Sequence, residues 1–204
     1  MKQFICAFIL LVASPPVLQA QSSDSKYENR IAISFSSFGD NFVYYSEGLA
    51  GAASYDGDYF FAVGIHYLHP LNRWLELETG AEYARHHILI NPNLPPQMDS
   101  TPRKAAFSLI NIPVTLRANF LRYFFVNGGP FLDIDASTES PIDSQTGLGA
   151  MLGIGMQCRL HSGIALFVNP YVKNHSLLPF GFFNHHERVF EAGFRLGITY
   201  PLNR

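Results

Sequence analysis

Charge is scarce in this chain, and so are cysteine and tryptophan. Only 15% of the 204 residues are charged, the net charge is −2, and there are two cysteines and one tryptophan. This net charge gives no electrostatic reason to expect nucleic acid as a partner. Cys158 is the one cysteine that follows the first twenty residues, so residues 21–204 can form no internal disulfide.

Long hydrophobic runs are also missing beyond the N-terminal segment. After Ala20, the longest stretch without Asp, Glu, Lys or Arg is 144–158, which contains four glycines and is too short to cross a bilayer as a helix. The mean hydropathy of +0.07 is too low for a helical membrane protein. A disordered chain is excluded as well, because 48% of the residues are hydrophobic and 18 Phe and 10 Tyr need a core or a membrane.

The first twenty residues have the order of an export signal. Lys2 precedes the apolar run 4–12, and Leu18-Gln19-Ala20 follows as a cleavage site with a small residue at its end. This order predicts a signal peptide, 1–20, that is cleaved after Ala20, and a single domain, 21–204. An exported chain without a second hydrophobic helix is either soluble outside the inner membrane or a β-barrel in an outer membrane.

Strict alternation of apolar and polar residues favours the barrel. In the segment 190–200, for example, the even positions are Phe, Ala, Phe, Leu, Ile and Tyr, and the odd positions carry Glu, Arg, Thr and glycine. A period of two residues is typical of a β-strand with two unlike faces. The same pattern predicts eight strands in all, at 31–35, 61–67, 75–83, 110–120, 126–134, 148–160, 164–172 and 190–200.

The connections between these strands alternate in length. Long loops are expected at 37–58, 87–104, 137–146 and 176–187, and short turns at 69–72, 121–122 and 161–163. An up-and-down barrel with both ends of the chain in the periplasm has long loops outside and short turns inside. The sequence therefore predicts an all-β fold, an eight-stranded antiparallel up-and-down transmembrane β-barrel, monomeric, in the outer membrane of a Gram-negative-type envelope.

The polar face of the strands carries charges of both signs. In a membrane barrel this face lines the lumen, whereas a soluble lipocalin-like barrel, the alternative, has its apolar face inside. Eight strands leave room for little more than their own side chains, so an ion-pair network that closes the lumen is expected. Its members are Glu76, Glu78, Glu82, Arg117, Asp133, Asp135, Arg159, Lys173, Glu191 and Arg195.

Glycine and proline also stand at particular places in the predicted strands. The glycines at 149, 153, 155, 193 and 197 are expected to make room in the lumen for bulky neighbours such as Phe131 and Tyr171. Pro113, Pro130 and Pro170 each remove a ladder hydrogen bond, so β-bulges are expected there.

Four segments resemble a known family. The runs 111–117 (NIPVTLR) and 123–130 (YFFVNGGP), with 175–177 and 193–200, resemble the PorT-like outer membrane protein β-barrel domain family, whose members are often labelled porin family proteins. The resemblance covers 21–204. It implies a small barrel of the OmpA and OmpX architectural type, without a shared active site, and it allows a place in an envelope or secretion assembly.

No metal, cofactor or catalytic site is expected. The pairs His86-His87 and His185-His186 belong to loops on opposite sides of the barrel, and neighbouring residues of a strand point to opposite faces. Some small outer-membrane barrels modify lipid A with a His, a Ser and a carboxylate. His175, Ser176 and Glu187 or Glu191 supply those residue types, but an adjacent His and Ser would lie on opposite faces of a strand.

The sequence thus predicts a non-enzymatic barrel with a plugged lumen. Its expected partners are outer-membrane lipid and, through the long loops, an extracellular or envelope protein. Aromatic residues in those loops support this, including Tyr44, Tyr45, Tyr55, Phe180, Phe182 and Phe183. Two alternatives remain open: a lipid A-modifying enzyme, and a narrow pore or small-solute carrier.

Overall fold

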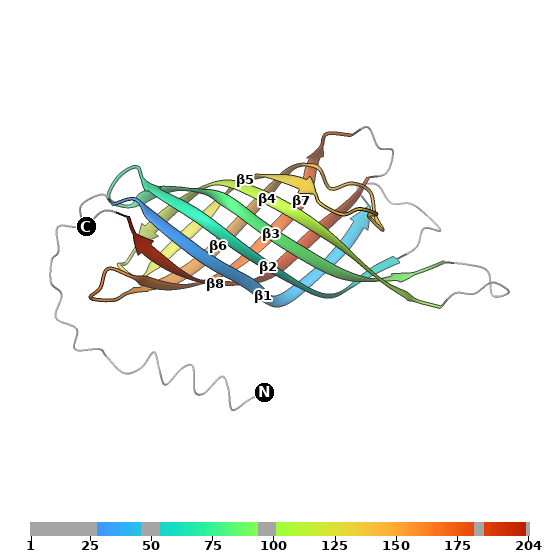
Figure 1. Cartoon of the computed structure of the whole chain (residues 1–204), viewed down its shortest axis with the longest axis horizontal. Coiled ribbons are helices and arrows are strands. Elements are labelled where there is room, and N and C mark those ends of the chain that lie inside the picture. Colours follow the sequence, from blue (N-terminus) through green and yellow to red (C-terminus); the bar gives the residue numbers. More distant parts are fainter. Residues whose placement is uncertain (1–27, 46–53, 94–100, 182–185, 203–204) are drawn as a thin grey trace, which may run out of the picture.

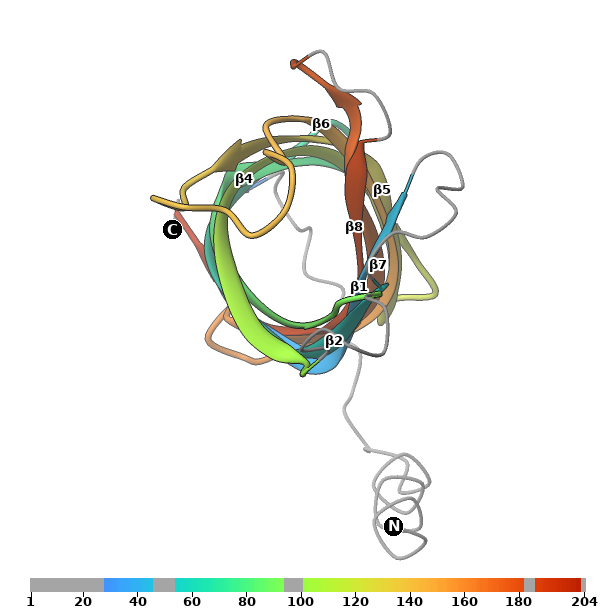
Figure 2. The same cartoon turned by 90° about the vertical axis from the view of Figure 1, so that its right-hand side faces the viewer.

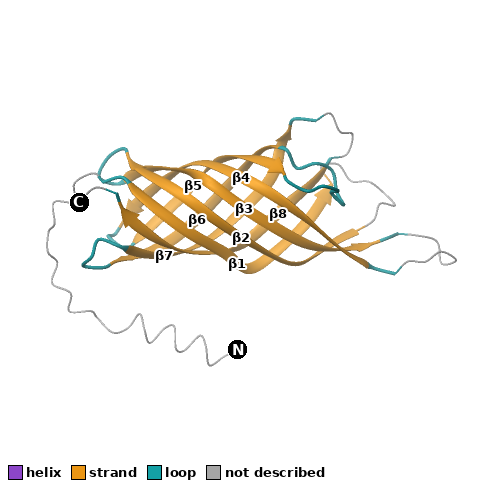
Figure 3. Ribbon diagram, viewed as in Figure 1, coloured by secondary structure: helices purple, strands orange, loops and turns teal. Residues whose placement is uncertain are grey.

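Eight long strands make up almost all of the structured chain (Figures 1 and 3). The computed structural model describes residues 28–45, 54–93, 101–181 and 186–202. The predicted signal peptide lies outside these residues, as do His185, Phe182 and Phe183. The strands are β1 (Arg30–Tyr45), β2 (Ser54–Pro70), β3 (Leu75–Asn91), β4 (Arg103–Phe120), β5 (Phe124–Asp135), β6 (Gly147–Arg159), β7 (Ala165–Pro179) and β8 (Glu187–Pro201).

The strands close into one barrel. Each is antiparallel to the next along the chain, and β1 pairs with β8 to complete the ring, which Figure 2 shows from one end. The predicted eight-stranded up-and-down fold is therefore confirmed. No helix among the described residues is both long enough and apolar enough to span a membrane.

The two ends of the barrel differ. At one end, here called the turn end, lie the short connections 71–74, 121–123 and 160–164 together with the C-terminal end of β8 (Figure 1). The opposite end, the loop end, carries the long connections. The predicted long and short connections alternate as expected, but most of the long loops are shorter than predicted, because β1, β2, β3, β4 and β7 run further.

A bulge in β1 explains why the first predicted loop began too early. Ser36 faces the lumen, whereas Asn41 faces it five residues later, so the alternation changes phase between them. The pairing with β8 shifts register between Ser37 and Asp40, and Phe38 has a positive φ of 59°. A one-residue insertion reverses which positions face inward. The strand therefore continues to Tyr45 even though its pattern is broken.

The outward surface of the barrel is an apolar belt. The exposed isoleucines, leucines and valines of the strands have exposed fractions of 37–65%, while most of their sequence neighbours face the lumen. A soluble barrel has the opposite arrangement, so the belt fits a lipid environment. Its most exposed aliphatic members on the strands are Ile33, Ile65, Leu152, Ile154, Leu178 and Ile198.

Inside the barrel, aromatic rings lie over glycines of the neighbouring strand. Phe131 covers Gly149, Phe125 covers Gly155, and Phe167 covers Gly197; a Cβ at any of these glycines would collide with the ring. Gly193 pairs with Tyr171, but the ring that covers it is that of Phe60 from β2. These glycines leave the space that the rings fill, as the sequence predicted.

The predicted bulges at the three prolines are wrong. The pairing on both sides of Pro113, Pro130 and Pro170 keeps one register. Each proline pairs with one neighbouring strand and leaves a gap in the ladder on the other side. A missing N–H can thus be accommodated by an unpaired position, without an inserted residue.

Candidate functional site

Eight of the ten charged residues expected in the lumen are buried there. Asp135 is only half-buried at the loop end, where its Oδ1 accepts a hydrogen bond of 3.0 Å from the backbone N–H of Ser137. Arg159 is the last residue of β6 and is exposed at the turn end. The buried members, at most 7% exposed, are Glu76, Glu78, Glu82, Arg117, Asp133, Lys173, Glu191 and Arg195.

The buried charges form three levels along the barrel axis. The level nearest the turn end is centred on Glu76. Arg30 Nη2 donates to its carboxylate, and Arg117 Nε lies 3.8 Å from Glu76 Oε2. Arg117 Nη2 also donates to Gln157 Oε1 at 2.8 Å. The Arg117 guanidinium is 3.5 Å from the ring centre of Phe125, so the cation is also covered by an aromatic face.

The middle level joins Arg195 to Glu78. Arg195 Nη1 lies 2.7 Å from Glu78 Oε1, and its Nη2 donates to Asn169 Oδ1 at 3.0 Å. His66 Nδ1 lies 3.7 Å from the same Glu78 oxygen, and its Nε2 is 2.7 Å from Ser34 Oγ. All these side chains are buried, and each large charge has an opposite charge next to it, as buried ions require.

The third level, towards the loop end, surrounds Lys173. Its Nζ donates to Glu82 and lies 3.8 Å from Glu191 Oε1, which in turn accepts from the hydroxyl of Tyr171. One ammonium therefore serves two carboxylates from β3 and β8. These strands are not neighbours in the sheet, so the contact crosses the lumen.

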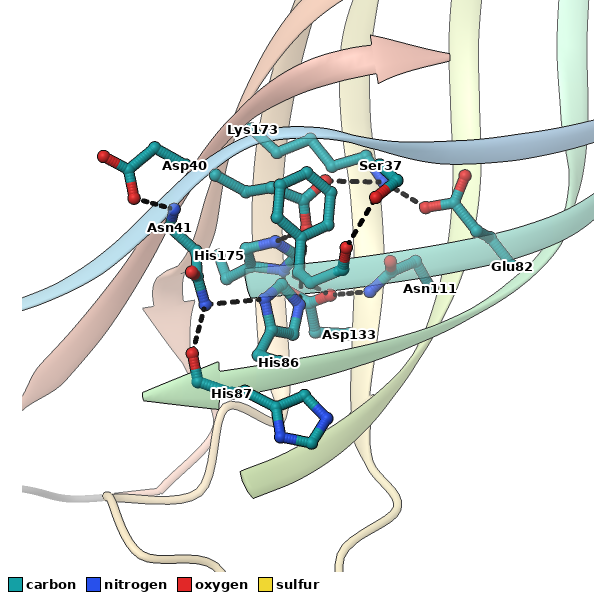
Figure 4. Close-up of polar contacts among 12 residues, drawn as sticks. Ser37, Asp40, Asn41, Glu82, His86, His87, Asn111, Asp133, Lys173 and His175 are labelled. Carbon is teal, nitrogen blue, oxygen red and sulfur yellow. Dashed lines mark hydrogen bonds and ion pairs between the residues drawn. The ribbon is translucent and has the colours of Figure 1, made fainter. Parts of the chain in front are cut away.

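Next to Lys173 lies a group of histidines and carboxylates (Figure 4). His175 Nδ1 is 3.1 and 3.2 Å from the two oxygens of Asp133, and Asn111 donates to that same carboxylate. His86 is fully buried, with its ring centre 5.5 Å from that of His175. His87 faces outward and stacks on Tyr59 at 4.0 Å between ring centres.

A bulge in β7 turns both His175 and Ser176 into the lumen. The pairing with β6 shifts between Leu148 and Ala150, and Ser176 has a positive φ of 48°. Both residues are fully buried. The expectation that adjacent residues must lie on opposite faces is therefore wrong here, because a bulge redirects one side chain.

Ser176 contacts a different histidine from the one considered in the sequence. Its Oγ is 3.0 Å from His186 Nε2, and His186 Nδ1 lies 3.7 Å from Asp143 Oδ2. Burial lowers the pKa of His186, which keeps the imidazole neutral and able to accept a proton at neutral pH. Glu187 accepts hydrogen bonds from the hydroxyl of Tyr55, at 2.5 Å, and from the backbone N–H of Asp143. Glu191 belongs to the Lys173 level.

An apolar cluster lies inside the barrel near each of its two ends. At the turn end Ala32, Leu68, Phe125 and Phe167 pack together. The loop-end cluster contains Ile142, which comes from the third loop and folds back over the strands. Its other members are Val43, Ile88, Ile90, Phe107, Leu109 and Val189. At the turn end the Glu76 level lies at the height of the apolar cluster, since Arg30 pairs with Leu68 and Arg117 packs on Phe125.

Comparison with known proteins identifies the class of fold. The chain is similar to the solid-state NMR structure of outer membrane protein AlkL in DMPC lipid bilayers, with a TM-score of 0.53 and 12% identity over 91% of this chain and 95% of that chain. This chain is a small barrel of the outer-membrane type. A second similar structure is the translocator domain of the autotransporter NalP from Neisseria meningitidis, with a TM-score of 0.39, 12% identity, and coverage of 86% and 89%.

The sequence comparisons add no finer assignment. No protein-family model matches the chain, and no curated protein does. The apolar belt and the shared fold agree with the predicted location in the outer membrane of a Gram-negative-type envelope.

Several residues of this site were missed in the sequence. Arg30, His66, His86 and His175 all lie on the inward face, but none of them was assigned to the lumen network. Arg30 precedes the predicted strand 31–35, His66 lies on the polar face of 61–67, and the two other histidines each lie three residues beyond a predicted strand. Extending the alternation through 75–83 to residue 86, and through 164–172 to residue 175, would have found both of those histidines. Ser176 carries no such signal, because the bulge breaks the alternation.

Proposed function

We propose that this barrel is closed, does not conduct, and serves as a rigid outer-membrane scaffold for interactions at its loop end. The observation that carries this proposal is the filled lumen. Three levels of buried ion pairs cross it, and Ile142 seals the loop end together with six strand residues. An ion that passed through the lumen would have to displace the paired charges and the side chains of the two apolar clusters.

Recording from planar bilayers tests the closed lumen. We expect no unitary current steps from the purified, folded chain, because paired buried charges and the loop-end apolar cluster fill the lumen. Faster gel migration of the unboiled sample, compared with the boiled one, would show that the protein in the bilayer is folded. Discrete steps from folded protein would contradict the proposal and favour the narrow pore or small-solute carrier.

The loop end is the proposed interaction surface. Phe180 is 61% exposed there and Leu178 is 65% exposed, just before the fourth loop. Variable loops on a rigid scaffold are the usual place for binding. The resemblance to PorT-like proteins suggests an envelope or secretion assembly as the setting, with an extracellular or envelope protein as the partner.

A lipid A-modifying enzyme is retained as a second candidate. The specific observation that favours it is the chain of contacts from Ser176 through His186 to Asp143, which has the order of nucleophile, base and orienting carboxylate. The positive φ of Ser176 is a further feature common at functional sites. Against it, Ser176 is fully buried, so an acyl chain would need the loop end to open.

Mass spectrometry of lipid A separates these two candidates. The scaffold function predicts identical lipid A from cells that make the wild-type chain, the Ser176→Ala variant or neither. The enzyme function predicts loss or gain of one acyl chain in cells with the wild-type protein alone. Ser36→Ala is a matched control, since Ser36 is a buried strand serine outside this group.

A further inference from the structure

Three side-chain atoms from three strands converge inside the barrel without hydrogen-bond partners among the described residues. They are His86 Nε2 on β3, His175 Nε2 on β7 and Glu191 Oε2 on β8. All three residues are completely buried, and the three atoms lie within 4.8 Å of one another. Burying unsatisfied polar atoms is costly, so their convergence needs a physical reason.

The spacing of these atoms matches the coordination shell of a metal ion. His86 Nε2 is 3.3 Å from Glu191 Oε2, and His175 Nε2 is 3.6 Å from that same oxygen. With metal–ligand bonds of about 2.0–2.1 Å, tetrahedral geometry places ligand atoms roughly 3.4 Å apart. Two imidazoles and one carboxylate form one of the common donor sets for zinc.

Further hydrogen-bond partners hold the three ligand side chains in place. His175 Nδ1 contacts Asp133, which also accepts from Asn111 and from the N–H of Ser176 at 3.3 Å. A carboxylate behind a ligating histidine fixes its ring and leaves Nε2 free to bind a metal. The other oxygen of Glu191 is occupied by the hydroxyl of Tyr171.

The amide of Asn41 lies next to the other ring nitrogen of His86. His86 Nδ1 lies 3.4 Å from Asn41 Nδ2, and Asn41 Oδ1 is buried without a hydrogen-bond partner among the described residues. Metal binding at Nε2 leaves the proton on Nδ1, and rotation of the Asn41 amide would let Nδ1–H donate to Oδ1, with loss of the 3.4 Å contact between Nδ2 and the backbone oxygen of His87. Nε2 would then present its lone pair to the shared point.

The charges around the site favour a divalent cation. The groups in direct contact with the three ligands and with one another contain three carboxylates, Glu82, Asp133 and Glu191, and one ammonium, Lys173. With both imidazoles neutral, these groups carry three negative charges and one positive charge, so their net charge is −2. A divalent ion would neutralise this charge.

We propose that His86, His175 and Glu191 bind one zinc ion inside the barrel, which ties β3 to β7 and β8 across the lumen. The site is independent of the proposed scaffold function, because it stands whether or not the loop end binds a partner. The apolar loop-end cluster covers this level, so the ion is incorporated while the barrel closes. Metal binding that accompanies folding adds to the stability of the folded state.

Metal analysis after refolding tests the proposal. The full mature chain is refolded into detergent with zinc chloride or with a chelator, passed through a desalting column, and assayed for zinc by mass spectrometry. We expect one zinc per chain, a higher urea midpoint for the zinc-loaded protein, and loss of at least about nine-tenths of the bound zinc in His86→Gln and Glu191→Gln. Cobalt refolded in place of zinc should give the visible absorption bands of a tetrahedral site.

Two matched variants keep the result interpretable. His66→Gln removes a buried lumen histidine outside the cluster and His87→Gln removes an outward one, and both should retain one zinc. Gel migration without boiling shows which variants are folded, and Asp133→Asn, which keeps all three ligands, should bind about 10–100-fold more weakly. Zinc-free folded wild type, or stoichiometric zinc that persists in folded His86→Gln and Glu191→Gln, would overturn the proposal.

Discussion

Lys173→Met is expected to lower the free energy of unfolding by about 3–5 kcal/mol. The substitution keeps the length of the side chain but removes the ammonium that serves Glu82 and Glu191. Both carboxylates are buried, so they would remain in a low-dielectric environment with one positive partner fewer. Urea unfolding of the barrel in detergent, followed by gel migration or circular dichroism, measures this change.

Lys104→Met is the matched control. Lys104 also forms an ion pair, with Asp58 at 3.0 Å, but its side chain is 78% exposed. Exposed pairs contribute little, so a change within about 0.5 kcal/mol is expected. Adding Glu82→Gln to Lys173→Met should recover part of the loss, since it removes one unpaired charge. Equal effects at the two lysines would show that the lumen network is not what stabilises the barrel.

Leu152→Arg is expected to destabilise the barrel in lipid vesicles by about 2–4 kcal/mol. Leu152 is 60% exposed on the outward face of β6, near the middle of the strand. In water this substitution would be nearly neutral, whereas in a bilayer it places a guanidinium in hydrocarbon. Reversible urea unfolding from vesicles gives the difference.

The same substitution at the turn end provides the comparison. Leu71 is 50% exposed in the connection 71–74, where an arginine can reach the aqueous phase. Leu71→Arg should therefore cost about 0–1 kcal/mol. If the two variants unfold at the same urea concentration, the outward surface does not lie in hydrocarbon.

The face on which each strand residue lies could be predicted, because successive side chains of a strand point to opposite faces. Ile33, Ile65 and Ile198 have small or polar neighbours on both sides, and all three are exposed on the outward face. An alternating pattern states which residues share a face, and the mixed charges of the polar face indicate a lumen rather than a solvated surface. Fold class and orientation therefore follow from local sequence.

The contacts within the lumen follow less directly. Lys173 and Glu82 are 91 positions apart, and their pairing depends on the stagger of all the strands between them. Alternation places both residues inside but does not set their heights along the barrel. The charged residues could be assigned to the lumen, whereas the three levels needed the three-dimensional register.

Bulges are the part that could not be predicted. Phe38 and Ser176 both have positive φ, and neither is a glycine, so no residue type marks the shifts of phase in β1 and β7. The prolines, which do stand out in the sequence, caused no bulge. The contact between Ser176 and His186 therefore depends on a backbone distortion that no sequence pattern predicts.

Fluorescence quenching by brominated lipids tests most directly whether the apolar face of the strands meets the bilayer. Trp74 is the single tryptophan and is 56% exposed at the turn end. In vesicles it should be quenched most by bromine near the headgroup, as an interfacial aromatic residue. In a Trp74→Phe background, Leu152→Trp should be quenched most by bromine deeper in the acyl chains. Quenching of both by aqueous iodide, with no effect of any brominated lipid, would contradict the account.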